Sequence, residues 1–136
     1  MAGFTNYLEA ALLDHILGGP SYERPASVYV ALSTTAPDDD GSGFTEPAGG
    51  GYARVAVTNN ATNWPAAEGD PTTKSNGDVI AFPQATDAWG TVTHFGIFDD
   101  TTGGNLLMSG PLDNPREVLF GDLVSFLAGE IKVTLD

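Results

Sequence analysis

The sequence predicts a mainly β protein, an antiparallel β-sandwich of jelly-roll-like type with one N-terminal α-helix. Three observations predict this fold. Short β-rich runs alternate with clusters of Gly, Asn, Asp and Pro, most clearly in residues 49–107. The chain has 17 Gly and 9 Pro, which suits a turn-rich protein. No segment between the runs has the length of a crossover helix, so the strands are expected to pair antiparallel.

The length of the chain predicts one domain. A chain of 136 residues is long enough for a single hydrophobic core and too short for two. We expect residues 1–20 to form the helix and a connector, and residues 21–136 to form a single β-sandwich domain.

The helix is expected over residues 6–17. Thr5 or Asn6 can cap it, and Asn6 with Glu9 has the spacing of a capping box. The Gly18-Gly19-Pro20 run supplies a stop signal. A helix this short is marginal alone, so its apolar stripe must pack on the β domain or on a neighbouring subunit. That stripe consists of Leu8, Leu12 and Ile16, widened by Leu13 and Leu17.

Eight or so short strands are expected after the helix. In the first, over residues 27–33, Val28, Val30 and Leu32 share one face, with Tyr29 and Ala31 on the other. The turn sequence DDTTGGN predicts a hairpin between the runs 91–98 and 105–108. Residues 34–51 and 59–77 are expected to form long loops. The remaining expected strands are residues 54–58, 79–82, 118–120, 123–127 and 130–135.

Charge and composition exclude several classes of partner. The chain has 18 acidic and 5 basic residues, a formal net charge of −13. Nucleic-acid binding needs clustered cations, and here they are scattered, so neither nucleic acid nor an anionic membrane is an expected partner. The absence of Cys excludes disulfides and thiolate chemistry. No secretory signal or membrane-spanning run is evident, so synthesis in the cytoplasm is expected.

The two histidines are not expected to be catalytic. His94 falls in the run 91–98, on the face predicted to carry Val92 and Phe98, and His15 follows Asp14 on the helix. A serine triad needs a histidine paired with a nucleophilic serine and an acid, and no G-x-S-x-G motif is present. We therefore predict a non-enzymatic protein with no catalytic residues.

The acidic clusters are interpreted as solvated turn residues. Asp38, Asp40, Ser42 and Gly43 match the first, third, fifth and sixth positions of an EF-hand loop, but Gly49 stands where the bidentate Glu belongs. A plain turn is favoured over a weak calcium site, and no metal or cofactor is predicted. The pair Asp99-Asp100 is likewise favoured as a turn over a glycosidase pair.

The aromatic residues leave two interpretations open. They can form a carbohydrate-stacking surface, or they can close the ends of the core, which is common for aromatics beside Pro or Gly in small β domains. The residues concerned are Trp64, Trp89, Tyr22, Tyr29 and Tyr52.

Several runs resemble a family of small bacteriophage structural proteins that is loosely labelled phage tail fibre-like. The similar runs are NYLEAALLDHILGG, SVYVALSTTAP, GGGYARVAVTNNATNWPAA, KSNG with a strand ending in FP, and WGTVTHFGIFDDTTGGNLL. The resemblance covers nearly the whole chain. It implies a virion component dominated by a β-sandwich, without enzyme activity or cofactor, and it brings no set of functional residues.

Size and composition favour one position on the virion. A receptor-binding fibre normally has a shaft, and this sequence shows neither repeats nor coiled-coil heptads. Our main prediction is therefore a capsid decoration or cement protein, bound in many copies to the head shell. The alternative is a tail fibre, tail-tip or baseplate component that takes part in host adhesion, including carbohydrate binding. Expected partners are further copies of the chain, for example in a trimer, and virion proteins such as the major capsid protein. The expected location is the virion, after synthesis in the host cytoplasm.

Overall fold

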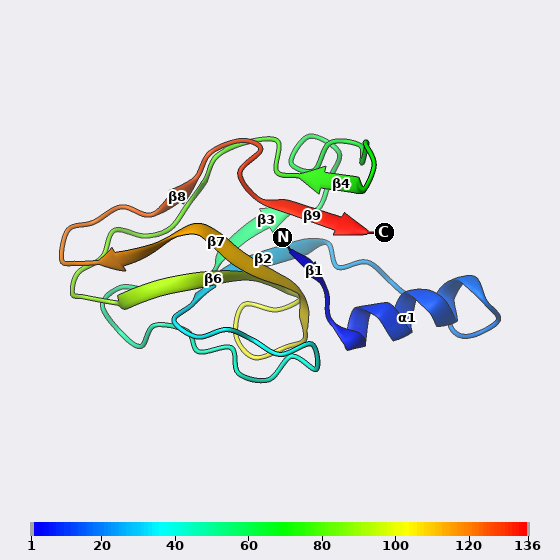
Figure 1. Cartoon of the computed structure of the whole chain (residues 1–136), viewed down its shortest axis with the longest axis horizontal. Coiled ribbons are helices and arrows are strands. Elements are labelled where there is room, and N and C mark those ends of the chain that lie inside the picture. Colours follow the sequence, from blue (N-terminus) through cyan, green and yellow to red (C-terminus); the bar gives the residue numbers. More distant parts are fainter. Residues whose placement is uncertain (1, 136) are drawn as a thin grey trace.

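The computed structural model describes residues 2–135, which fold into antiparallel sheets and one helix (Figure 1). The largest sheet has five antiparallel strands in the order β1-β7-β6-β2-β3. Its strands are β1 (Gly3–Phe4), β2 (Ser27–Ser33), β3 (Val55–Thr58), β6 (Gly90–Phe98) and β7 (Leu106–Val118). Two antiparallel ladders pair β4 (Thr72–Ser75) with β9 (Lys132–Leu135), and β5 (Ile80–Ala81) with β8 (Ser125–Phe126). The helix α1 spans Asn6–Ile16. The predicted fold class, mainly β and sandwich-like with an N-terminal helix, is confirmed.

The main core lies between the five-stranded sheet and the two ladders (Figure 1). Val28, Val30 and Leu32 of β2 point into it, as their alternation predicts. The ladders and the segments beside them cover this face with side chains that include Ile80, Phe82, Phe126, Ile131 and Val133. The apolar face of each layer is thereby removed from water by the other layer, which is the main favourable term in forming the fold.

The opposite face of the main sheet is also buried. Ala31 of β2 packs with Phe98 of β6 and Leu106 of β7, and Phe44 from the segment between β2 and β3 lies against them. Phe44 meets the Phe98 ring edge to face, with 5.1 Å between the ring centroids. The long 34–51 segment therefore covers the second face of the sheet.

Helix α1 begins at Asn6 as predicted and ends at Ile16, one residue before the predicted end, and only its first half is packed. Thr5 is the N-cap residue, yet its hydroxyl donates to the Leu106 and Leu107 carbonyls and not to the helix. The expected Asn6–Glu9 capping box is therefore wrong. The side chain of Leu8 is 4% exposed and that of Ile16 is 72% exposed, because the C-terminal half of α1 extends beyond the sheet (Figure 1). No helix within residues 2–135 has both the length and the apolar character to cross a bilayer.

Two strand predictions are wrong for reasons of pairing. Residues 72–75 were expected in a loop, but they form β4 because β9 pairs with them along their whole length. Residues 105–108 and 118–120 were expected as separate strands, but β7 runs continuously through Pro111 and Pro115. Proline is tolerated at bulges and edges. Here the register between β6 and β7 shifts beside Pro111, and β1 pairs only with Met108 and Ser109.

The predicted face of His94 is also wrong. The ladder between β6 and β7 is irregular between Val92 and His94, so side-chain alternation shifts by one residue there. Val92 remains in the main core, whereas His94 lies opposite Ser33 on the other face of the sheet. His94 shares that face with Phe98 as expected, but not with Val92.

Candidate functional site

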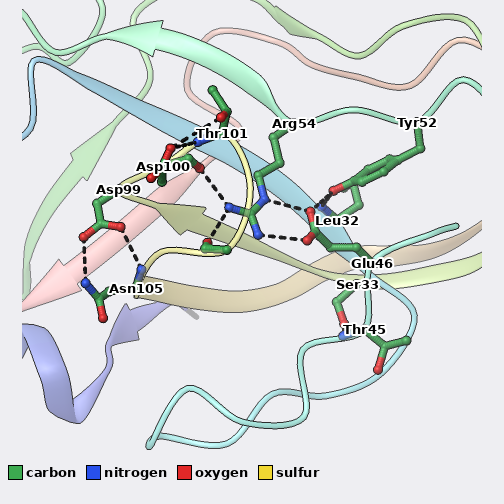
Figure 2. Close-up of polar contacts among 11 residues, drawn as sticks. Leu32, Ser33, Thr45, Glu46, Tyr52, Arg54, Asp99, Asp100, Thr101 and Asn105 are labelled. Atoms are coloured by element: carbon green, nitrogen blue, oxygen red, sulfur yellow. Dashed lines mark hydrogen bonds and ion pairs between the residues drawn. The ribbon is translucent and has the colours of Figure 1, made fainter.

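A polar site with contacts from several segments is centred on Arg54, immediately before β3 (Figure 2). Its guanidinium makes two parallel bonds to the Glu46 carboxylate, Nε to Oε1 and Nη2 to Oε2, both 2.9 Å. Its Nη1 donates to the carbonyls of Asp100 and Gly103, at 2.8 and 2.9 Å. The guanidinium carbon lies 3.7 Å from the centroid of the Phe98 ring. The Arg54 guanidinium is thus hydrogen-bonded along its edges and packed against an aromatic ring on one face.

Tyr52 extends this cluster into the sheet. Its hydroxyl donates to Glu46 Oε1 at 2.7 Å and accepts the backbone N–H of Leu32 at 3.1 Å. Burial, with the Glu46 hydrogen bond next, raises the pKa of Tyr52 far above its usual range. Burial alone would raise the pKa of Glu46, but hydrogen bonds from Arg54 and Tyr52 and the Arg54 charge outweigh it, so this pKa lies below its ordinary value. Glu46 is therefore ionised and Tyr52 neutral at neutral pH.

We name Arg54, Glu46 and Tyr52 the arginine clamp, because they join two loops that are distant in sequence. Glu46 belongs to the 34–51 segment, and the carbonyls of Asp100 and Gly103 belong to the turn between β6 and β7. The clamp therefore gives a fixed geometry to two loops that composition alone marks as irregular.

The acid pair at the hairpin shapes the turn, as its interpretation as turn residues predicts. Asp99 accepts the backbone N–H of Asn105 at 2.7 Å and its side-chain amide at 2.9 Å (Figure 2). Asp100 accepts the N–H of Thr101 at 2.7 Å. Their carboxylates are bound to the turn itself, not arranged across a sugar-sized cleft.

The EF-hand-like run 38–43 also forms a turn. Asp40 Oδ1 accepts the backbone N–H of Ser42 at 2.9 Å and its hydroxyl at 2.6 Å, and these hydrogen bonds lower the pKa of Asp40. Ser42 also donates to Asp38 at 3.4 Å. Within the described part of the chain, no group of three or more His, Asp or Glu side chains is placed to hold a metal ion.

Both histidines make local contacts. His94 Nδ1 lies 2.8 Å from the Thr93 hydroxyl, and burial lowers the pKa of His94. His15 Nδ1 accepts the backbone N–H of Tyr22 at 3.0 Å, which ties the end of α1 to the connector after it. Within residues 2–135 neither ring has a hydrogen bond to an acid and a serine together, the arrangement that a triad requires.

The two tryptophans close the core and do not form an exposed stacking surface. Trp89 is buried, donates from Nε1 to the Gly50 carbonyl at 2.8 Å, and meets Tyr52 edge to face. Trp64 is buried as well. Its Nε1 has no hydrogen-bond partner among the described residues, which is unusual because buried donors are nearly always paired.

Trp64 lines an apolar groove beside helix α1. We call this surface the groove. Its volume is about 340 Å³, within the range of sites that take a ligand-sized group. Its rim carries Arg24 and Lys74, neither of which forms an ion pair within residues 2–135. Sequence reasoning missed the groove, because its walls come from segments far apart in the chain. Its apolar lining includes Phe4, Leu8, Leu12, Trp64, Met108 and Leu135.

Two further apolar surfaces are exposed. The helix-end patch, Leu13, Ile16 and Leu17, continues outward from the half of α1 that lines the groove. The loop patch, Leu119, Phe120 and Leu123, follows β7 at the end of the sheet opposite to α1 (Figure 1). Exposed apolar groups gathered in this way are typical of contact surfaces.

The carboxylates of Asp40, Asp99 and Asp100 are hydrogen-bonded within turns, and both histidines make local contacts. The exposed features described above are apolar surfaces. The fold is a mainly β module with exposed apolar surfaces that suit contact with other molecules. The family model of Podophage GP4 fiber I protein gp80 matches residues 3–134, and the chain belongs to this family. It is a phage structural protein, and the resemblance noted from the sequence is confirmed. A search among curated proteins found no significant match.

Proposed function

We propose that the chain is a non-enzymatic component of a phage fibre. The family match over residues 3–134 carries this proposal, because the matched family is described as a fibre protein. It supports the fibre alternative better than the capsid decoration that size and composition favoured. The engagement of the acids and histidines in local structure supports the absence of catalysis.

The helix-end patch supplies a surface by which such a component joins neighbouring subunits of the fibre. The Ile16 side chain is extensively exposed and continues the apolar stripe beyond the packed half of α1. An apolar surface of this kind is costly to leave in water and gains free energy when a neighbouring protein covers it. Burial of Leu8 holds the helix in place for that contact.

Location on the particle is the direct test. Gold-labelled antibodies against the chain are expected to mark the tail of purified particles and to leave the head unlabelled. Label spread over the head, with a copy number near that of the shell subunits, would overturn the fibre proposal and restore capsid decoration. The Ile16→Asp chain is expected to fold but to be missing from particles, and the matched control is Glu9→Gln on the same helix. Normal incorporation of Ile16→Asp would refute the role given to the helix-end patch.

A further inference from the structure

The groove lies beside α1 and the loop patch follows β7, and these two elements place them at opposite ends of the molecule (Figure 1). We propose that the loop patch of one copy binds in the groove of a second copy, so that the chain assembles head to tail. This inference concerns the purified chain and holds wherever the protein sits on the particle. Three observations carry it: the hydrogen-bonded turn that holds the loop patch, the charge of the two surfaces, and the apolar lining of the groove.

The loop patch presents a preformed apolar anchor. Phe120 is 77% exposed, the highest value among the large apolar side chains described. The turn that carries it is closed by two bonds, Leu119 N–H to Asp122 Oδ2 at 2.9 Å and Asp122 N–H to the Leu119 carbonyl at 3.0 Å. Gly121 takes a φ of +86° in this turn and donates to the Ala85 carbonyl at 2.7 Å. A turn whose backbone is already fixed loses little backbone entropy when the aromatic side chain that it carries binds, and this suits an interface anchor.

The charges of the two surfaces are opposite. Arg24 and Lys74 line the groove, in a chain whose net charge is −13. Asp122 lies in the turn between the members of the loop patch, and Arg116 and Glu117 precede that turn, so the segment 116–123 carries two acids and one cation. An apolar segment with a net negative charge therefore meets an apolar groove with a basic rim. Such pairing sets the orientation of partners as well as their attraction.

The lining of the groove is mostly apolar and includes Phe4, Leu8 and Met108. The occupant that such a lining favours is itself apolar. Three of the five residues in the segment 119–123 are Leu or Phe, which fits this lining.

The contact is between copies and is heterologous. The loop patch follows the C-terminal end of β7, whereas the groove lies beside α1 at the other end of the molecule, so one chain cannot fill its own groove (Figure 1). Each copy then offers one free groove and one free loop patch. Repetition of such a contact gives a closed ring, if the rotation closes, or an open chain of subunits.

Cross-linking between single cysteines tests this contact, because the native chain has no Cys. Leu123→Cys marks the loop patch and Leu135→Cys marks the rim of the groove. Both side chains are exposed, so the fold is retained, and circular dichroism checks this. With a short bismaleimide, a mixture of the two variants is expected to give a covalent dimer that neither variant gives alone. A dimer from Leu135→Cys alone would show that grooves face each other and would overturn the proposal, as would the absence of any dimer.

A second pair of variants tests the anchor. Phe120→Asp, added to the Leu123→Cys chain, is expected to reduce the mixed dimer to background. Leu127→Asp adds the same charge at an exposed leucine outside the loop patch and is expected to leave the yield unchanged. Equal yields from the two chains would overturn the role of Phe120. Failure here leaves the fibre proposal intact, because antibody labelling of particles tests that proposal separately.

Discussion

Replacing Glu46 by Gln tests the arginine clamp, because it removes one charge without changing the size of the side chain. The Arg54 side chain is 6% exposed and that of Glu46 is 26% exposed. Removing one partner of a fully buried pair costs about 3–5 kcal/mol, whereas exposed pairs contribute about 0–1 kcal/mol. The partial exposure of Glu46 places the expected loss of unfolding free energy at about 2–4 kcal/mol. The amide also puts a donor where Arg54 needs an acceptor, so one guanidinium N–H loses its partner.

Urea unfolding followed by the fluorescence of the two tryptophans measures this loss. With a slope of about 2 kcal/mol per M urea, the midpoint of Glu46→Gln is expected to fall by about 1–2 M. Glu9→Gln makes the same chemical change on an exposed helical residue and is expected to move the midpoint very little. A loss below about 1 kcal/mol for Glu46→Gln would refute the reasoning, because Arg54 would then be satisfied by backbone carbonyls and Phe98 alone.

Three further predictions concern pH, the helix and the packing of the sheet. Because the pKa of Glu46 is lower in the folded state, its contribution to stability is present above its unfolded pKa of about 4.5 and is lost as pH falls through the folded value. The difference in unfolding free energy between the native chain and Glu46→Gln should therefore shrink in acid. A difference that stays constant with pH would contradict this. Leu8→Asp buries a charge, so this chain should fail to fold, which circular dichroism detects. Ile16→Asp should keep its unfolding free energy within about 0.5 kcal/mol of the native chain. Equal behaviour of the two variants would show that the helix is not docked on the sheet. A Cβ at Gly96 would lie 2.5 Å from the Phe44 ring, so Gly96→Ala should lower the unfolding free energy measured in urea by about 1–3 kcal/mol. Gly3→Ala is the control, because a Cβ at Gly3 meets no atom within 4 Å. Equal losses in the two variants would contradict close packing at Gly96.

The parts of the fold that depend on local patterns could be predicted. The alternation in β2 placed Val28, Val30 and Leu32 in the main core, where the structure has them. The turn sequence DDTTGGN placed the hairpin between β6 and β7, and Gly103 and Gly104 take positive φ in that turn. These features are decided by residues within a few positions of each other, so one sequence contains the signal for them.

The candidate site was not predicted, because its parts meet only in the folded chain. Arg54 is the first residue of an expected strand, and nothing local distinguishes it from a solvated cation, although its place beside an alternating apolar run is a weak signal of burial. Its partners come from the 34–51 segment and from the β6–β7 turn. The groove was missed for the same reason, since helix α1, β7 and β9 each contribute only part of its lining.

The sequence by itself determined the class of this protein: a turn-rich, mainly β chain with one helix and a resemblance to phage structural proteins, all of which depend on composition, period and local motifs. Tertiary structure alone decided which apolar residues are covered. It buried Leu8 and left Ile16 exposed on the same helical stripe, and it made β4 a strand by pairing it with β9. The physical reason is that burial and strand pairing are properties of two segments together. A pattern shows that a surface is apolar, but only the arrangement of the other segments determines whether that surface faces the core or a partner.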